Sequence, residues 1–102
     1  KVLRGSVGFL VGRCFASEGW HAEAIGEFKE SIKALAGSDH EAELSLRYDL
    51  MQSLAAKAKD DENIDLAREA MEICSSIARR DISYRDIRAC RRNLDDLVKE
   101  LD

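Results

Sequence analysis

Proline is absent from this chain of 102 residues, and aromatic side chains make up only 6% of it. Without proline, no ring fixes φ or removes a backbone donor inside a helix, so long uninterrupted helices are allowed. No apolar run approaches the roughly 18 residues that a membrane-spanning helix needs, and no stretch has the pattern of a secretory signal peptide. These absences predict a helical protein of the cytoplasm that does not enter a membrane.

Basic residues are fewer than acidic residues: the chain has 16 lysines and arginines and 20 aspartates and glutamates, and its net charge is −4. This balance argues against general nucleic-acid binding, which requires a basic surface. With 45% hydrophobic and 35% charged residues, the chain has the composition of a globular protein, and residues 1–102 form one domain's worth of sequence. The chain starts at Lys1 instead of Met, so we expect it to be a piece of a larger protein.

Cysteine is scarce, and Cys14, Cys74 and Cys90 form an odd set without a close pair. An odd set favours a reducing compartment, where free cysteines usually act as small core hydrophobes. The alternative is a metal site shared with His21 and His40, but no Cys-x-x-Cys or His-x-x-x-His spacing supports it. We therefore expect core cysteines, no metal and no cofactor.

What the sequence does contain is apolar residues that recur at intervals of three and four throughout its length. This spacing predicts an all-α fold of five amphipathic helices, over residues 3–18, 21–36, 38–59, 64–79 and 83–101. Two capping boxes, Ser38 with Glu41 and Ser83 with Asp86, mark helix starts. The polar residues 60–63 predict a solvated turn, from which Asp61 or Asn63 would cap the fourth helix.

Glycine is used at the ends and the contact points of the first two helices. Gly19 and Gly37 follow these helices, where a left-handed residue commonly ends a helix. Gly8 and Gly12 fall inside the first helix, where each weakens it by about 1 kcal/mol relative to alanine. We interpret them as places where a neighbouring helix approaches too closely for a side chain.

Large and small residues alternate along the first two helices at Val11-Gly12, Phe15, Gly19, Ala24, Phe28 and Ser31. This pattern resembles a tetratricopeptide repeat, in which such residues occupy fixed positions of a helical hairpin. A divergent second repeat would use Leu50-Met51, Leu54, Ala58, Ala67, Met71 and Cys74, with about four extra residues lengthening its turn. The resemblance implies a right-handed α-α superhelix with repeat one at about 5–38, repeat two at about 39–80 and a capping helix at about 83–101.

The resemblance also implies a concave groove, lined by the first helix of each pair, that binds a peptide or partner segment. The implied groove residues are Phe9, Arg13, Ser45, Tyr48 and Gln52, with Asp86 and Cys90 from the last helix. Phe9 and Tyr48 would be the aromatic anchors; alternatively, they fill space between the layers. The lysine and asparagine clamp of one known subtype is missing.

Residues 79–92 hold six arginines against two aspartates, although the middle of the chain is acidic. If a helix starts at Ser83, Arg85, Arg88 and Arg92 fall on one face at i, i+3 and i+7. This strip could bind an acidic or phosphorylated partner, because arginine forks suit carboxylate and phosphate. The alternative is a solvated face that pairs with nearby aspartates, which surface charge runs usually are.

No spacing indicates catalysis, since there is no phosphate-binding glycine loop after a strand and no nucleophile–base grouping. We therefore expect a non-enzymatic protein-interaction module, part of a larger cytoplasmic and bacterial protein. The first alternative is a structural spacer or self-association domain that forms a homodimer. The second is an accessory domain of an enzyme, which only the flanking sequence would reveal.

Overall fold

The computed structural model describes residues 11–35 and 37–102, and within them it contains helices and turns but no β-strand. Residues 11–17 form a helical segment that precedes four longer helices. These helices are α2 (His21–Leu35), α3 (His40–Asp61), α4 (Ile64–Arg80) and α5 (Ile87–Leu101). The predicted all-α class is confirmed. None of the described helices combines the length and apolar character that would carry it across a bilayer.

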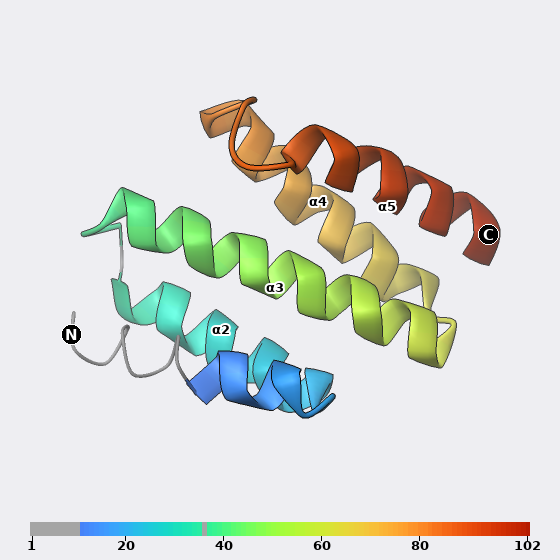
Figure 1. Ribbon diagram of the computed structural model, residues 1–102, viewed down its shortest axis with the longest axis horizontal. Helices are drawn as coiled ribbons and strands as arrows, with labels where there is room; N and C mark the ends of the chain where they lie inside the picture. Colours follow the sequence, from blue (N-terminus) through green and yellow to red (C-terminus); the bar gives the residue numbers. More distant parts are fainter. Residues whose placement is uncertain (1–10, 36) are drawn as a thin grey trace.

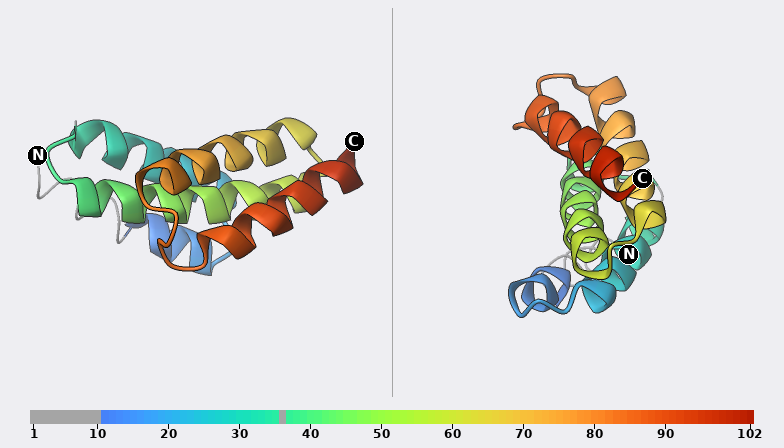
Figure 2. Two further views of the ribbon diagram at one scale, coloured as in Figure 1. Left: turned by 90° about the horizontal axis from the view of Figure 1, so that it is seen from above. Right: turned by 90° about the vertical axis from the view of Figure 1, so that its right-hand side faces the viewer.

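Each helix packs mainly on its neighbours in sequence: α2 on α3, α3 on α4, and α4 on α5. Consecutive helices run antiparallel, so α3 and α5 run parallel, as do α2 and α4 (Figure 1). Figure 2 shows that α2 and α4 lie on one side of α3, while segment 11–17 and α5 lie on the other. The thinnest dimension of 18 Å fits two layers of helices about 10 Å across. Helix α5 lies at the end of this stack; the handed superhelix stays a prediction.

Helix α3 lies at the centre of the stack and contributes the largest share of the core. Its buried residues spread over a wide arc, because α2 and α4 both pack against it. Leu46, near the N-terminal end of α3, is only 2% exposed. The described buried hydrophobic residues are Ala24, Phe28, Leu35, Leu46, Leu50, Met51, Leu54, Ala58, Ala67, Ala70, Cys74, Ile77, Ile87, Cys90, Leu94 and Leu97.

Gly12 makes the close helix contact that the sequence predicts. A Cβ atom at this position would lie 2.5 Å from Cε1 of Phe28, which is itself buried in α2. This approach turns the side of segment 11–17 that carries Gly12, Phe15 and Ala16 toward the core. Cys14 lies two residues from Gly12, about 200° around the helix, and is exposed. The expectation that Cys14 is a core residue is therefore wrong, whereas Cys74 and Cys90 are buried as predicted.

The turn after segment 11–17 is a Schellman motif. Gly19 has a positive φ of 82° and donates its backbone N–H to Ala16, while Trp20 donates to the carbonyl of Phe15. The rings of Phe15 and Trp20 stack with centroids 5.8 Å apart. This hydrophobic contact commonly accompanies the motif, and it explains why a half-exposed tryptophan is found at this turn. The left-handed caps predicted at Gly19 and Gly37 are confirmed.

The connection between α3 and α4 is shorter than the sequence indicates. Helix α3 continues to Asp61, and only Glu62 and Asn63 separate it from α4. Glu62 takes the left-handed conformation at φ 50°, and Asn63 caps α4 by accepting N–H groups from Asp65 and Leu66. The extra residues thus lengthen the helix, not the turn, and Ala58 lies inside α3 instead of at the turn.

Both predicted capping boxes are wrong in detail. At the start of α3 the cap is Asp39, whose carboxylate accepts the N–H of Ala42, and not Ser38. Before α5, the carboxylate of Asp81 instead accepts both the N–H and the hydroxyl of Ser83. These bonds fold residues 81–86 into turns, so α5 begins four residues later than expected, at Ile87.

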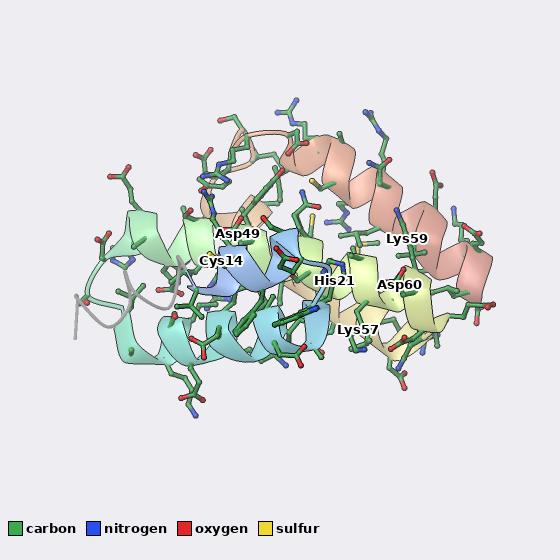
Figure 3. All side chains as sticks on the ribbon, turned by 60° about the horizontal axis from the view of Figure 1, so that its bottom comes forward. Cys14, His21, Asp49, Lys57, Lys59 and Asp60 are labelled. Carbon is green, nitrogen blue, oxygen red and sulfur yellow. The ribbon has the colours of Figure 1, made fainter. Side chains whose placement is uncertain are left out.

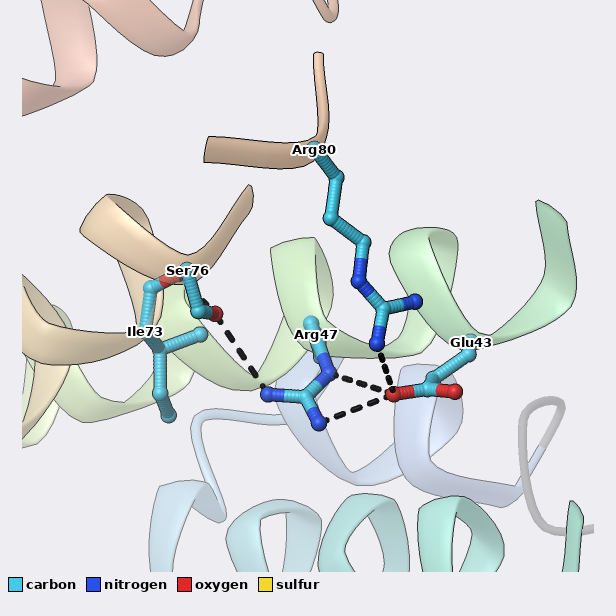
Figure 4. A network of polar contacts seen from close by, with 5 residues as sticks. All are labelled: Glu43, Arg47, Ile73, Ser76 and Arg80. Atoms are coloured by element: carbon cyan, nitrogen blue, oxygen red, sulfur yellow. Dashed lines mark hydrogen bonds and ion pairs between the residues drawn. The ribbon is translucent and has the colours of Figure 1, made fainter. Parts of the chain in front are cut away.

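A buried carboxylate joins α3 to α4. Glu43 is 6% exposed and accepts bonds from Nε and Nη2 of Arg47, each 2.8 Å long, with Nη2 of Arg80 3.7 Å away. Arg47 also reaches Ser76 on α4 at 3.4 Å, and Ser76 donates to the carbonyl of Ile73 (Figure 4). The paired arginines compensate for burying this charge, and the network fixes the register of the two helices.

Candidate functional site

A groove runs between the parallel helices α3 and α5. Its central part is a pocket of about 140 Å³, which continues at the C-terminal ends of both helices into a second pocket of about 450 Å³. Lys59 and Leu97 line both pockets, so the two adjoin, and we call them together the groove. The central residues are Met51, Gln52, Ala55, Lys59, Asp86, Cys90, Asn93, Leu94 and Leu97, and the second pocket adds Glu62, Glu100 and Leu101.

The groove exists because α4 packs against both α3 and α5 from one side and leaves the other side open. On this open side, the small side chain of Ala55 leaves space that a larger residue would fill. The side chains of Met51, Leu94 and Leu97 form an apolar floor, and each of these residues is at most 5% exposed.

Polar side chains form the rim of the groove. The side chains of Lys59 and Asn93 are exposed and make no hydrogen bond or ion pair with any described residue. Lys59 projects from α3 toward α5 (Figure 3). A free amide and a free ammonium above an apolar floor can bind the backbone and side chains of a peptide.

Tyr48 closes the N-terminal end of the groove and holds the start of α5 against α3. Its hydroxyl donates to Oδ1 of Asp86 at 2.5 Å, and its ring makes an edge contact with Tyr84. The guanidinium of Arg85 lies 4.9 Å from the Tyr48 ring centroid and 5.1 Å from that of Tyr84, and it donates to Ser45. These contacts give Tyr48 a positioning role.

Electrostatics in this cluster follow from the same contacts. Burial, followed by the bond to Asp86, raises the pKa of Tyr48 above its ordinary value of 10.0. The same bond lowers the pKa of Asp86, because the hydroxyl stabilises the ionised carboxylate. Burial raises the pKa of the Cys90 thiol, so this cysteine lacks the thiolate character of a nucleophile.

The structure brings together most of the residues that the sequence assigns to the groove. Gln52, Asp86 and Cys90 line it, while Ser45 and Tyr48 lie at its N-terminal end. Arg13 forms an ion pair with Asp49 of α3 at 3.2 Å, which links segment 11–17 to α3. Figure 3 shows Asp49 and the exposed Cys14 where segment 11–17 lies beside α3. Phe9 lies outside the described residues.

The arginine strip is arranged differently from the prediction. Because α5 begins at Ile87, Arg85 lies in the preceding turn with a positive φ of 45° and stacks on the tyrosines. Arg88 and Arg92 do share a face of α5, and Arg91 joins them beside a pocket. The predicted alignment of Arg85 with the other two is therefore wrong, because it required helix at residues 83–86.

The predicted groove did not include Lys59 or Asn93, and the predicted face of the arginine strip did not include Arg91 or Ile82. Helical spacing from Asp86 and Cys90 could have indicated Asn93 and Leu97, which continue the same face of α5. No pattern in the sequence could have indicated Ile82, because its position depends on the turns that Asp81 forms.

These pieces define an all-α protein with an open groove in a stack of antiparallel helices. Among the residues that the structure describes, no group of three or more His, Cys, Asp or Glu residues is arranged to hold a metal ion. Comparisons with the sequence profiles of known families, with curated proteins and with solved structures find no match. The resemblance to the tetratricopeptide repeat therefore stays a prediction from the sequence.

Proposed function

We propose that this protein is an interaction module that binds an extended peptide segment of a partner in the groove between α3 and α5. The observation that carries this proposal is the apolar groove floor beneath the unpaired polar groups of Lys59 and Asn93. The repeat-like spacing of the sequence supports it, since stacked hairpins present such grooves.

The composition of the groove indicates the chemistry of its ligand. The floor of Met51, Leu94 and Leu97 favours apolar side chains, and the Asn93 amide suits a peptide backbone. Glu62 and Glu100 outnumber Lys59 at the C-terminal end, so a basic residue of the ligand fits there best.

The test starts from peptides selected from a displayed random library on the intact protein. A selected peptide is then titrated against the variant Ala55→Gln, which fills the groove from a half-buried helical position. The matched control is Ala22→Gln on the exposed side of α2. We expect Ala55→Gln to weaken binding at least about tenfold, because displaced apolar contacts cost a few kcal/mol, whereas Ala22→Gln leaves it unchanged.

Equal binding by both variants, with folding confirmed by circular dichroism, would contradict the groove assignment. The alternative role is self-association without a peptide ligand. Sedimentation velocity over a range of concentrations separates the two roles, because a groove binder stays monomeric without ligand. A dimer that Ala55→Gln dissociates would favour the alternative.

A further inference from the structure

The face of α5 opposite the groove carries a separate pocket, of about 430 Å³, between the end of α4 and α5. Its apolar wall includes Ile82 and Ile87, and its charged wall consists of Arg88, Arg91 and Arg92, with Asp95 at the end. On a helix, residues 88, 91, 92 and 95 share one face, whereas residues 86, 90, 93 and 97 of the groove share the other. The pocket is therefore separate from the groove.

The arginines of this pocket form no ion pair with the described aspartates near them. Asp81 accepts bonds from Ser83, Asp86 accepts the hydroxyl of Tyr48, and Asp95 pairs with Lys99 at 3.1 Å. The guanidinium groups of Arg88 and Arg92 make no ion pair or hydrogen bond with any described residue. The expected pairing with Asp81, Asp86 or Asp95 is therefore absent among the described contacts of these arginines.

Two further features point to a ligand. Arg91 donates to Ser75 of α4 at 3.3 Å, which holds its guanidinium at the pocket between the two helices. Ile82 is 54% exposed, one of only two large hydrophobic residues so exposed in the described chain, and it lies beside these charges. An exposed isoleucine beside unpaired arginines offers both an apolar contact and charge-assisted hydrogen bonds.

We propose that this pocket docks an acidic segment of a partner protein, which places an apolar side chain on Ile82 and carboxylates on Arg88, Arg91 and Arg92. Charge complementarity selects an anionic occupant, because three guanidiniums face one carboxylate that is already paired with Lys99. The apolar wall and the net charge of −4 favour a peptide over a nucleic acid, which requires a broad basic surface.

The experiment is a fluorescence anisotropy titration of the full chain with a labelled synthetic peptide of repeated Glu-Leu-Glu-Glu units. The control peptide has glutamine in place of every glutamate. We expect the acidic peptide to bind, the glutamine peptide not to bind, and the affinity to fall with added salt because screening weakens exposed charge contacts. Failure of the acidic peptide to bind at millimolar concentration, or equal binding of both peptides, would overturn the proposal.

Variants locate the site. The double variant Arg88→Gln, Arg92→Gln should weaken binding about tenfold or more, since it removes two charge-assisted contacts. The control Lys33→Gln, Arg79→Gln removes the same charge from exposed positions outside the pocket and should change affinity little. Ile82→Ser should weaken binding without altering the charge.

Three outcomes would each overturn the proposal: equal losses in the two double variants, tighter binding of duplex DNA than of the acidic peptide, and a dimer that Arg88→Gln, Arg92→Gln dissociates. Loss of peptide binding in Ala55→Gln, with Arg88→Gln, Arg92→Gln unaffected, would assign the acidic peptide to the groove and overturn the proposal as well. These variants can thus contradict the proposal for the groove and the proposal for the arginine pocket separately.

Discussion

At the scale of single residues, the contact between Gly12 and Phe28 decides how closely segment 11–17 approaches α2. A Cβ at Gly12 would lie 2.5–2.9 Å from three atoms of the Phe28 ring, and Phe28 is 1% exposed. Gly26 provides the comparison, because it lies inside α2 with nothing within 4 Å of an added Cβ.

We predict that Gly12→Ala is less stable than Gly26→Ala by about 1–3 kcal/mol. Both changes gain about 1 kcal/mol of helical preference, but only Gly12→Ala forces a packed ring to shift, which costs about 1–3 kcal/mol. Urea unfolding followed by circular dichroism measures both. Equal stability of the two variants would mean that the close approach does not exist in solution.

Tyr48 is the residue whose ionisation reports on the attachment of α5. Because its pKa in the folded protein lies above the ordinary 10.0, its contribution to stability is present below pH 10 and is lost as pH rises through the higher folded value. We predict that the tyrosinate absorbance of Tyr48, taken as wild type minus Tyr48→Phe, appears at higher pH in the folded protein than in urea. Coincident curves would show that the bond to Asp86 does not hold.

At the scale of elements, α5 covers the apolar face that α4 would otherwise expose. Ile87, Leu94 and Leu97 are each at most 5% exposed, and Cys74 and Ile77 of α4 are fully buried. Burial of a large aliphatic side chain contributes about 1.5–3 kcal/mol, and the total stability of a domain is about 5–15 kcal/mol. Burial of Ile87, Leu94 and Leu97 therefore contributes a large part of the free energy of unfolding.

We predict that a chain ending at Arg80 loses cooperative unfolding, while retaining part of its helical signal. Differential scanning calorimetry and far-ultraviolet circular dichroism check this. As a control, Arg92→Gln, Asp96→Asn alters only the exposed face of α5 and should unfold cooperatively. A sharp thermal transition in the shortened chain would show that the first helices form a sufficient core.

At the scale of the whole molecule, the helices form an open stack in which inner helices have more packing partners than outer ones. Helices α3 and α4 each pack on two neighbouring helices, whereas α5 packs mainly on α4. In such stacks, opening begins at the ends, because each unit is stabilised only by its neighbours.

We therefore predict a gradient of amide protection. Hydrogen exchange should be slowest around Leu50–Leu54 of α3 and Ala70–Cys74 of α4, and faster in α5 and in segment 11–17. Mass spectrometry of peptic fragments measures it, and lowering the protein concentration controls for self-association. Uniform protection across all helices would indicate one cooperative bundle instead of a stack.

The sequence alone determined the all-α class, the order of the helices and most of their buried faces. These follow from local rules: apolar spacing marked Ala24, Phe28 and Ile77, and glycine marked the left-handed caps at Gly19 and Gly37. The close approach at Gly12 was also predictable, because a glycine inside a helix needs a reason.

Only the tertiary structure decided which residues face each other across helices. The carboxylate of Asp81 accepts a hydrogen bond from the hydroxyl of Ser83, and α5 begins only at Ile87. Arg85 therefore lies in a turn, away from the helical face of Arg88 and Arg92. The groove between α3 and α5 combines residues 51–59 with residues 86–97, which are distant in sequence. The pocket of Arg88, Arg91 and Arg92 lies where the end of α4 meets α5, and its shape depends on the turns at residues 81–86. Local patterns predict each helix by itself, but a site between helices depends on how their packed surfaces fit together.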